Sequence, residues 1–96
     1  MTTTSYPPDS APVTVTLTGI EAVTGMGKVT HLAIVDIEVG GIAWQLQGVR
    51  VVKHNGGLQC QAPQFRHPKS GRYLPGVVLP GVLSDHIAAE VLAAVS

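Results

Sequence analysis

The feature that most constrains the fold is a succession of β-strand patterns separated by glycine turns. Four stretches carry such a pattern, at residues 13–18, 29–39, 42–52 and 58–62. The first, VTVTLT, alternates apolar residues with threonines, which is typical of a half-buried strand. The turns are TGMGK, Gly40-Gly41 and HNGG, and such short glycine-containing loops join antiparallel neighbours. The pattern therefore predicts an antiparallel meander of about four strands.

Two details refine this meander. LAIV, in the middle of the second stretch, is apolar on both faces, which predicts a central strand that is covered on both sides. In the third stretch the apolar residues occupy even-numbered positions before Gly48, as at Trp44, and odd-numbered positions after it, as at Val49. Such a shift at glycine predicts a β-bulge, which would place Trp44 and Val49 on the same side of the sheet.

The chain changes character after Pro63. Residues 63–72, PQFRHPKSGR, contain turn residues throughout and predict an exposed loop. Residues 74–83 contain the tetrapeptide LPGV twice, which predicts two successive turns whose apolar residues need cover.

The last stretch, SDHIAAEVLAAVS, predicts a helix over residues 84–96. Ser84 or Asp85 can cap it, and Ile87, Val91 and Val95 form one apolar stripe. The fold class is therefore α+β, an antiparallel meander with one C-terminal helix.

Size and composition predict one small domain that associates with a second copy. Residues 1–12 are rich in Thr, Ser and Pro and predict a disordered N-terminal tail, which leaves 13–96 as a single domain. Apolar residues make up 45% of the chain but aromatic residues only 4%, so the core is small and built from aliphatic side chains. A small core, an edge strand and the apolar LPGV turns together predict a homodimer.

The same sequence predicts a cytoplasmic protein. One cysteine, Cys60, excludes an intramolecular disulfide and fits a reducing compartment. The N-terminus does not resemble a signal peptide, and no apolar run approaches the length of a membrane span, so no membrane partner is expected.

Charge is distributed unevenly along this chain of zero formal net charge. Residues 1–39 carry four acids and one base, and residues 85–96 carry two acids. Residues 40–84 hold five bases and no acid. This segment predicts a basic surface, and a Pro/Gly loop with basic residues at a spacing of three can approach a phosphate backbone. Ordinary solvated surface charges remain the other interpretation.

The candidate nucleic-acid-binding residues are the five cations and two aromatic residues near them. They are Arg50, Lys53, Arg66, Lys69, Arg72, Phe65 and Tyr73. In this hypothesis Arg66 and Arg72 contact phosphates, Lys69 contributes to the general field, and Phe65 or Tyr73 stacks on a base.

Enzymatic chemistry is not expected. Ser84, Asp85 and His86 are adjacent and cannot converge as a catalytic triad does. The four histidines stand on separate elements without ligand spacing, so no metal site, catalytic residue or cofactor is predicted. Cys60 occupies an apolar position of its strand and is interpreted as a small core residue.

One run of motifs has a counterpart in a known family. Along residues 30–95 a Val-Arg-Val triplet, an Asn-Gly turn, a strand closed by proline, a basic loop, an aromatic residue and a later proline follow one another. The residues are Val49-Arg50-Val51, Asn55-Gly56-Gly57, Pro63, Arg66, Pro68, Gly71, Tyr73 and Pro80. This order resembles the septation regulators named after stage V sporulation protein G, which are small bacterial proteins. The resemblance implies a homodimer with a sheet extended across the subunits, and binding of DNA and RNA to regulate gene expression.

A protein-interaction or assembly module is the alternative. Here Trp44, the LPGV segment and the apolar helix stripe would form a hydrophobic partner surface, and the basic loop would only maintain solubility.

Overall fold

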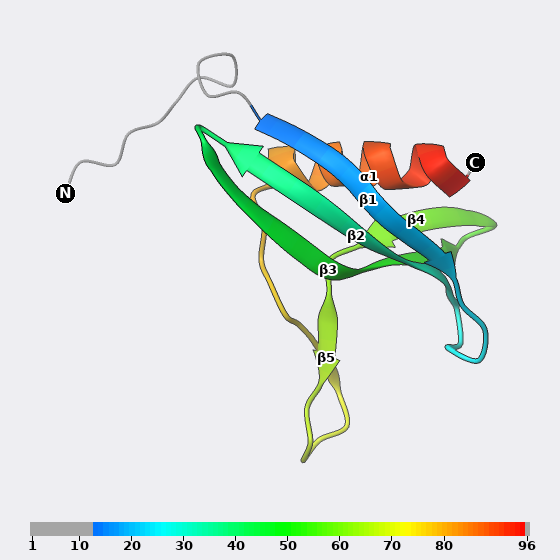
Figure 1. Ribbon diagram of the computed structural model, residues 1–96. Coiled ribbons are helices and arrows are strands. Elements are labelled where there is room, and N and C mark those ends of the chain that lie inside the picture. Colours follow the sequence, from blue (N-terminus) through cyan, green and yellow to red (C-terminus); the bar gives the residue numbers. More distant parts are fainter. Residues whose placement is uncertain (1–12, 96) are drawn as a thin grey trace.

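A computed structural model describes residues 13–95, and the predicted tail at 1–12 lies outside the described residues. The elements in chain order are β1 (Val13–Ala22), β2 (Val29–Val39), β3 (Ile42–His54), β4 (Gly57–Gln61), β5 (Gln64–Arg66), β6 (Tyr73–Pro75) and α1 (Gly81–Val95). The first four strands form one antiparallel sheet in the order β1-β2-β3-β4, with α1 on one face (Figure 1). The predicted α+β meander with a C-terminal helix is confirmed.

The β3 strand is longer than the strand that follows it. β4 pairs only with the stretch of β3 from Arg50 to His54. The earlier part of β3, from Ile42 to Val49, therefore has β2 on one side and no partner strand on the other among the described residues. This free edge carries Ile42 and Trp44, which are 70% and 41% exposed.

The predicted bulge at Gly48 is confirmed. In the β2–β3 ladder Val49 pairs with Ala33 and Gln47 pairs with Ile34, so Gly48 has no partner and the register shifts. Gly48 has a φ of +78°, a left-handed conformation that costs other residues strain. Trp44 pairs with Ile37 on the same side of the sheet as Val49, as the parity change predicts.

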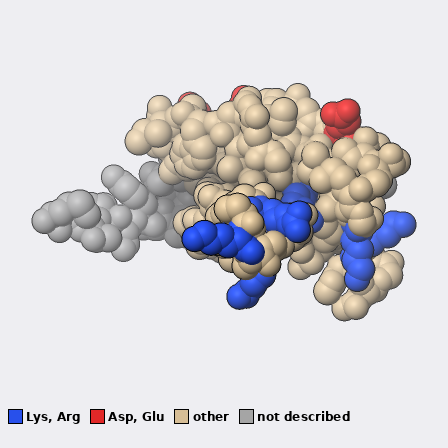
Figure 2. All heavy atoms as spheres, turned by 90° about the horizontal axis from the view of Figure 1, so that it is seen from below, with Lys and Arg blue, Asp and Glu red and all other residues tan. Residues whose placement is uncertain are grey.

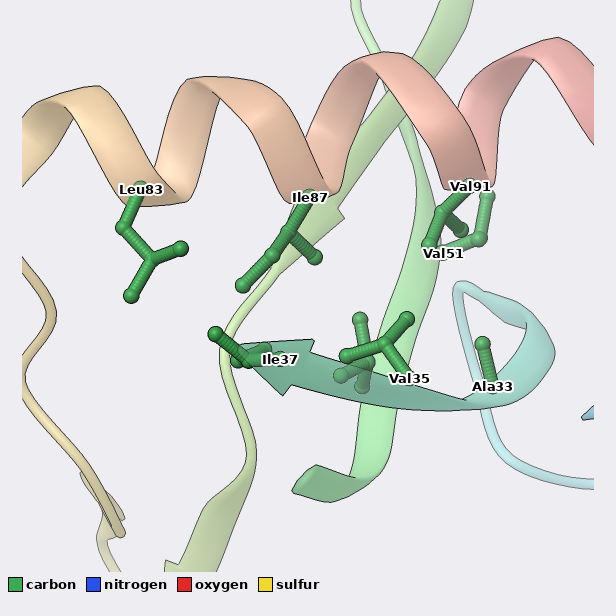
Figure 3. Packing of buried hydrophobic residues seen from close by; sticks show 8 residues of the cluster. Ala33, Val35, Ile37, Val51, Leu83, Ile87 and Val91 are labelled. Atoms are coloured by element: carbon green, nitrogen blue, oxygen red, sulfur yellow. The ribbon is translucent and has the colours of Figure 1, made fainter. Parts of the chain in front are cut away.

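The core lies between α1 and the sheet. Its buried members are Ala33, Val35, Ile37, Val49, Val51, Leu83, Ile87 and Val91. Figure 3 shows Leu83, Ile87 and Val91 pointing from the helix toward the sheet. The predicted helix stripe therefore covers the sheet of its own chain. Cys60 packs half-buried against this cluster, and burial raises the pKa of its thiol.

The expectation that the LAIV segment is covered on both sides is wrong for the described residues. Ala33 and Val35 are buried under α1, but Leu32 and Ile34 on the other face are only half-buried. The only helix of residues 13–95 lies across one face, so we call the other the open face (Figure 1). Polar neighbours occupy much of the open face, where Gln45 donates a hydrogen bond to Asp36.

The helix begins three residues earlier than the sequence predicts. Gly81 is its first residue, and the Ser84 N–H donates to the Pro80 carbonyl at 3.0 Å. Ser84 and Asp85 thus lie inside the helix and do not cap it, and the second LPGV is no turn. Proline suits a helix start because it lacks an N–H, and the added turn buries Leu83 in the core.

Residues 63–72 are not simply a loop. β5 pairs with β6, with Gln64 opposite Pro75 and Arg66 opposite Tyr73, so this segment forms a hairpin that projects from the sheet (Figure 1). Strands of three residues are too short for an alternating pattern to be recognised in the sequence. The prolines within the segment, considered without their tertiary context, favour an irregular loop.

Candidate nucleic-acid interface

The base of the β5–β6 hairpin is attached to the bulge of β3. The Gly76 N–H donates to the Pro63 carbonyl at 2.8 Å and closes the base. A Cβ atom on Gly48 would lie 3.7 Å from the Pro63 side chain, so the bulge and the hairpin are in close contact. The bulge at Gly48 therefore lies beside the base of the hairpin.

The two faces of the hairpin carry different candidate residues. Arg66 and Tyr73 are cross-strand partners and share one face, whereas Phe65 and Leu74 share the other. Tyr73 is 65% exposed and Phe65 48% exposed. The structure thus places the two aromatic candidates on opposite faces, and both rings are accessible.

The tip of the hairpin is ordered by polar contacts around His67. The His67 N–H donates to the Arg72 carbonyl at 2.8 Å. The His67 Nδ1 atom accepts from the Lys69 and Ser70 N–H groups at 3.2 and 3.3 Å. The Ser70 hydroxyl accepts from the Arg72 N–H at 3.2 Å. These contacts hold Lys69 and Arg72 at the end of the projecting hairpin.

Arg66 lies over the tip glycine. Its Nε–H donates to the Gly71 carbonyl at 3.4 Å, and a Cβ on Gly71 would lie 3.3 Å from its Nη2. Gly71 has a φ of +72°, so both its conformation and its space favour glycine. The guanidinium is directed along the hairpin toward the exposed tip.

Arg50 reaches the hairpin from the open face of β3. Its Nη1 donates to the Gln64 side-chain oxygen, and its Cζ lies 5.8 Å from the centre of the Tyr73 ring. A cation at this distance is attracted by the ring electrons. The contacts bring Arg50, Tyr73 and Arg66 onto one side of the hairpin, although they are far apart in sequence.

Lys53 lies apart from this group. It stands three positions after Arg50 in an unbroken part of the β3–β4 ladder, so its side chain leaves from the other face of the strand. Its N–H donates to the Lys28 carbonyl at 2.9 Å, and both lysines line a depression with His54 and Asn55. The structure thus separates Lys53 from the hairpin, with which the sequence grouped it.

Sequence reasoning missed Lys28, because it stands in an acidic segment of the chain. An antiparallel meander places the start of β2 beside the end of β3. The predicted topology could therefore have identified Lys28, just before β2, as a neighbour of Lys53 near the end of β3.

The basic residues are not neutralised within the described chain. Among residues 13–95, none of the lysines or arginines forms an ion pair with a carboxylate. Figure 2 views the molecule from below and shows Lys and Arg side chains on this side of it, on the projecting hairpin and near the β1–β2 and β3–β4 turns. The Asp and Glu side chains in this view lie at its margin. This side of the molecule therefore carries positive charge that no ion pair among residues 13–95 compensates.

Two further findings concern the same described range. No three His, Cys, Asp or Glu side chains between residues 13 and 95 lie close enough together to hold a metal ion. No helix in this range is long and apolar enough to cross a membrane.

Comparisons with known proteins add no relative. No family model, no curated protein and no solved structure matches this chain.

Proposed function

We propose that the protein is a small, non-enzymatic regulator that binds DNA or RNA by contacting phosphates with the β5–β6 hairpin. The observation that carries the proposal is the set of hairpin cations, which project from the sheet without an ion pair among residues 13–95. Phosphate contacts of this kind supply most sequence-independent affinity. The regulatory role rests on the resemblance to the stage V sporulation protein G family. The single cysteine favours a reducing compartment, so we place the protein in the cytoplasm.

Each part of the hairpin has a role in this proposal. Arg66 and Arg72 contact phosphate oxygens, because a guanidinium presents several N–H donors to a phosphate. Lys69, at the exposed tip, adds to the positive field. The accessible rings of Phe65 and Tyr73 are available for stacking on bases.

A homodimer belongs to the same proposal. The unpaired edge of β3 carries the exposed Ile42 and Trp44, and an edge of this kind pairs readily with a second strand. Two copies would present two hairpins to one nucleic acid and raise the affinity through effective concentration.

Light scattering tests the homodimer and should give twice the 10.0 kDa of one chain. Ile42→Lys should give monomers, and Gln45→Lys on the open face of the same strand is the matched control.

A protein-interaction module is the second candidate, and the same edge favours it. Trp44 is exposed on β3, and Val78 and Val82 are exposed near the start of α1. The helix stripe is not available to a partner, since Ile87 and Val91 are buried against the sheet. Such a module would bind a protein through Trp44, and its affinity for that protein would not depend on the hairpin cations.

A salt titration tests the proposed function. Fluorescence anisotropy should measure binding to labelled random DNA and RNA at increasing ionic strength. Affinity should fall steeply with salt, and Arg66→Ala with Arg72→Ala should weaken binding to all sequences and reduce the salt slope by about two. The matched control, Lys28→Ala with Lys53→Ala, removes the same charge from the depression that these two lysines line and should have the smaller effect.

The outcomes separate the candidates. Equal losses in the two double variants would assign binding to overall charge and remove the hairpin from the proposal. No binding of the wild-type protein at low salt would overturn the nucleic-acid function. Melting temperatures of both variants should equal that of the wild type, because all four side chains lie outside the core.

A further inference from the structure

A depression on the open face connects the hairpin with the β1–β2 turn. Among its lining residues are Met26, Val29, Leu32, Arg50, Gln64 and Tyr73, and we call it the Arg50–Tyr73 depression. Its volume is about 670 Å³, which is within the range of small-molecule sites. It lies beside the proposed phosphate-binding residues, because Tyr73 is the cross-strand partner of Arg66.

The walls of this depression combine three kinds of chemistry. Tyr73, which is 65% exposed as a residue, offers an aromatic ring. Gln64 and Arg50 provide an amide and a guanidinium, joined by one hydrogen bond. Val29 and Leu32 provide apolar surface from β2, and Met26 adds a thioether at the turn. A flat, polar-edged aromatic ligand needs this combination of a stacking ring, hydrogen-bonding groups and apolar contact.

Arg50 has unused hydrogen-bonding capacity. Of the N–H donors of its guanidinium, only one on Nη1 has a partner within the described chain. The Nε–H is fully buried and makes no hydrogen bond with any described residue. The Nη2 donors also lack a partner among the described residues but are not fully buried, so an acceptor that enters the depression can hydrogen-bond to them, which a fully paired arginine would not allow.

The turn beside the depression leaves it open. Gly25 and Gly27 lie on its rim with φ values of +75° and +61°, and a Cβ on either would meet no atom within 4 Å. No side chain of these two residues therefore obstructs a ligand that approaches from the turn.

We propose that the Arg50–Tyr73 depression holds an unpaired nucleobase, and that the protein therefore prefers single-stranded nucleic acid. This inference rests on the proposed function. The base stacks on Tyr73 and places an acceptor at Arg50, while its neighbouring phosphates lie toward Arg66. A duplex cannot fill the depression without extruding a base, which costs unstacking and unpairing energy. Phosphate contacts alone use the hairpin tip and leave the depression empty.

Matched aromatic variants test the inference. Anisotropy should compare a labelled single-stranded oligonucleotide with the duplex of the same sequence at one ionic strength. Tyr73→Ala should lower single-strand affinity by roughly 5- to 150-fold and leave duplex affinity unchanged. Tyr73→Phe keeps the ring and should bind the single strand as the wild type does. Val78→Ala removes an exposed apolar side chain outside the depression and the hairpin, and should have little effect.

A second variant tests the guanidinium. Arg50→Lys keeps the charge and loses the planar set of donors, so it should weaken single-strand binding without changing the salt slope. The same variant should leave duplex binding unchanged, because the duplex does not enter the depression.

The outcomes distinguish this inference from the function on which it rests. Equal losses in Tyr73→Ala and Val78→Ala, or equal losses for single strand and duplex, would overturn the depression as a base site. If Tyr73→Ala has no effect while Arg66→Ala with Arg72→Ala weakens binding, the inference fails and the proposed function stands. If the wild-type protein binds neither probe, both fail.

Discussion

The sheet–helix body and the β5–β6 hairpin are held together by different forces. The body contains a continuous aliphatic core between α1 and the sheet, and no lysine or arginine belongs to that core. The hairpin has no fully buried residue and is ordered by backbone pairing and by polar contacts around His67. Stability therefore resides in the body, and the hairpin carries its charges outside the core.

The junction between the two regions is small and specific. Gly48 and Pro63 are in contact, and Arg50 extends from the body to Gln64 and Tyr73 of the hairpin. Substitutions in the body, at the junction and in the hairpin should consequently have effects of different size and kind.

The largest effect should follow from Ile87→Ala. Ile87 is buried at the centre of the helix stripe, so truncation removes apolar contacts and leaves a cavity. The free energy of unfolding should fall by about 2–5 kcal/mol, as measured by urea denaturation. Val82→Ala, on the exposed side of the same helix, should change it by less than about 0.5 kcal/mol. Similar losses in both variants would mean that α1 does not cover the sheet as described.

An intermediate effect should follow from Gly48→Ala at the junction. The new side chain must adopt a φ of +78°, which costs about 1–3 kcal/mol in the free energy of unfolding. Gly57→Ala is the matched control, because Gly57 lies in a strand without a positive φ and its Cβ has ordinary space. A loss at Gly57 as large as that at Gly48 would contradict the bulge as the source of strain.

The smallest effect on global stability should follow from His67→Ala in the hairpin. The variant removes the acceptor of the Lys69 and Ser70 N–H groups and leaves the core intact. Amide hydrogen exchange at these two residues should become faster, while the urea midpoint stays within error of the wild type. His54→Ala, at the β3–β4 turn, should leave exchange at the tip unchanged. A large shift of the midpoint would instead make the hairpin part of the cooperative unit.

Local patterns were sufficient to predict the body. Alternation from residue 13 onward predicted β1, and the parity change at Gly48 predicted the bulge and the common side of Trp44 and Val49. The helix was predicted from its apolar stripe, but its start was placed too late. The cue that was overlooked is Leu83, which extends the stripe by one turn and is buried.

The candidate site was less accessible to sequence reasoning. The charge distribution along the chain identified the hairpin cations, yet it grouped Lys53 with them and omitted Lys28. Charge counted along a segment does not tell on which face of a strand a side chain stands, which explains the error at Lys53. It also does not tell which distant segments lie side by side, which explains the omission of Lys28. The contact of Arg50 with Tyr73 joins residues from β3 and β6, and no local pattern relates them.

The amino-acid sequence alone determined the fold class, the face of the helix that is buried and the segment that carries the positive charge. These properties depend on periods of two and of about 3.6 residues and on composition, which are readable within one stretch of chain. Only the tertiary structure decided that residues 64–75 pair as a hairpin and that Arg50 turns toward it while Lys53 turns away. Backbone hydrogen bonds form between residues of almost any type, so the sequence pattern does not reveal strands of three residues. The depression is lined by segments that are distant in the chain, so it forms only when the whole chain is packed.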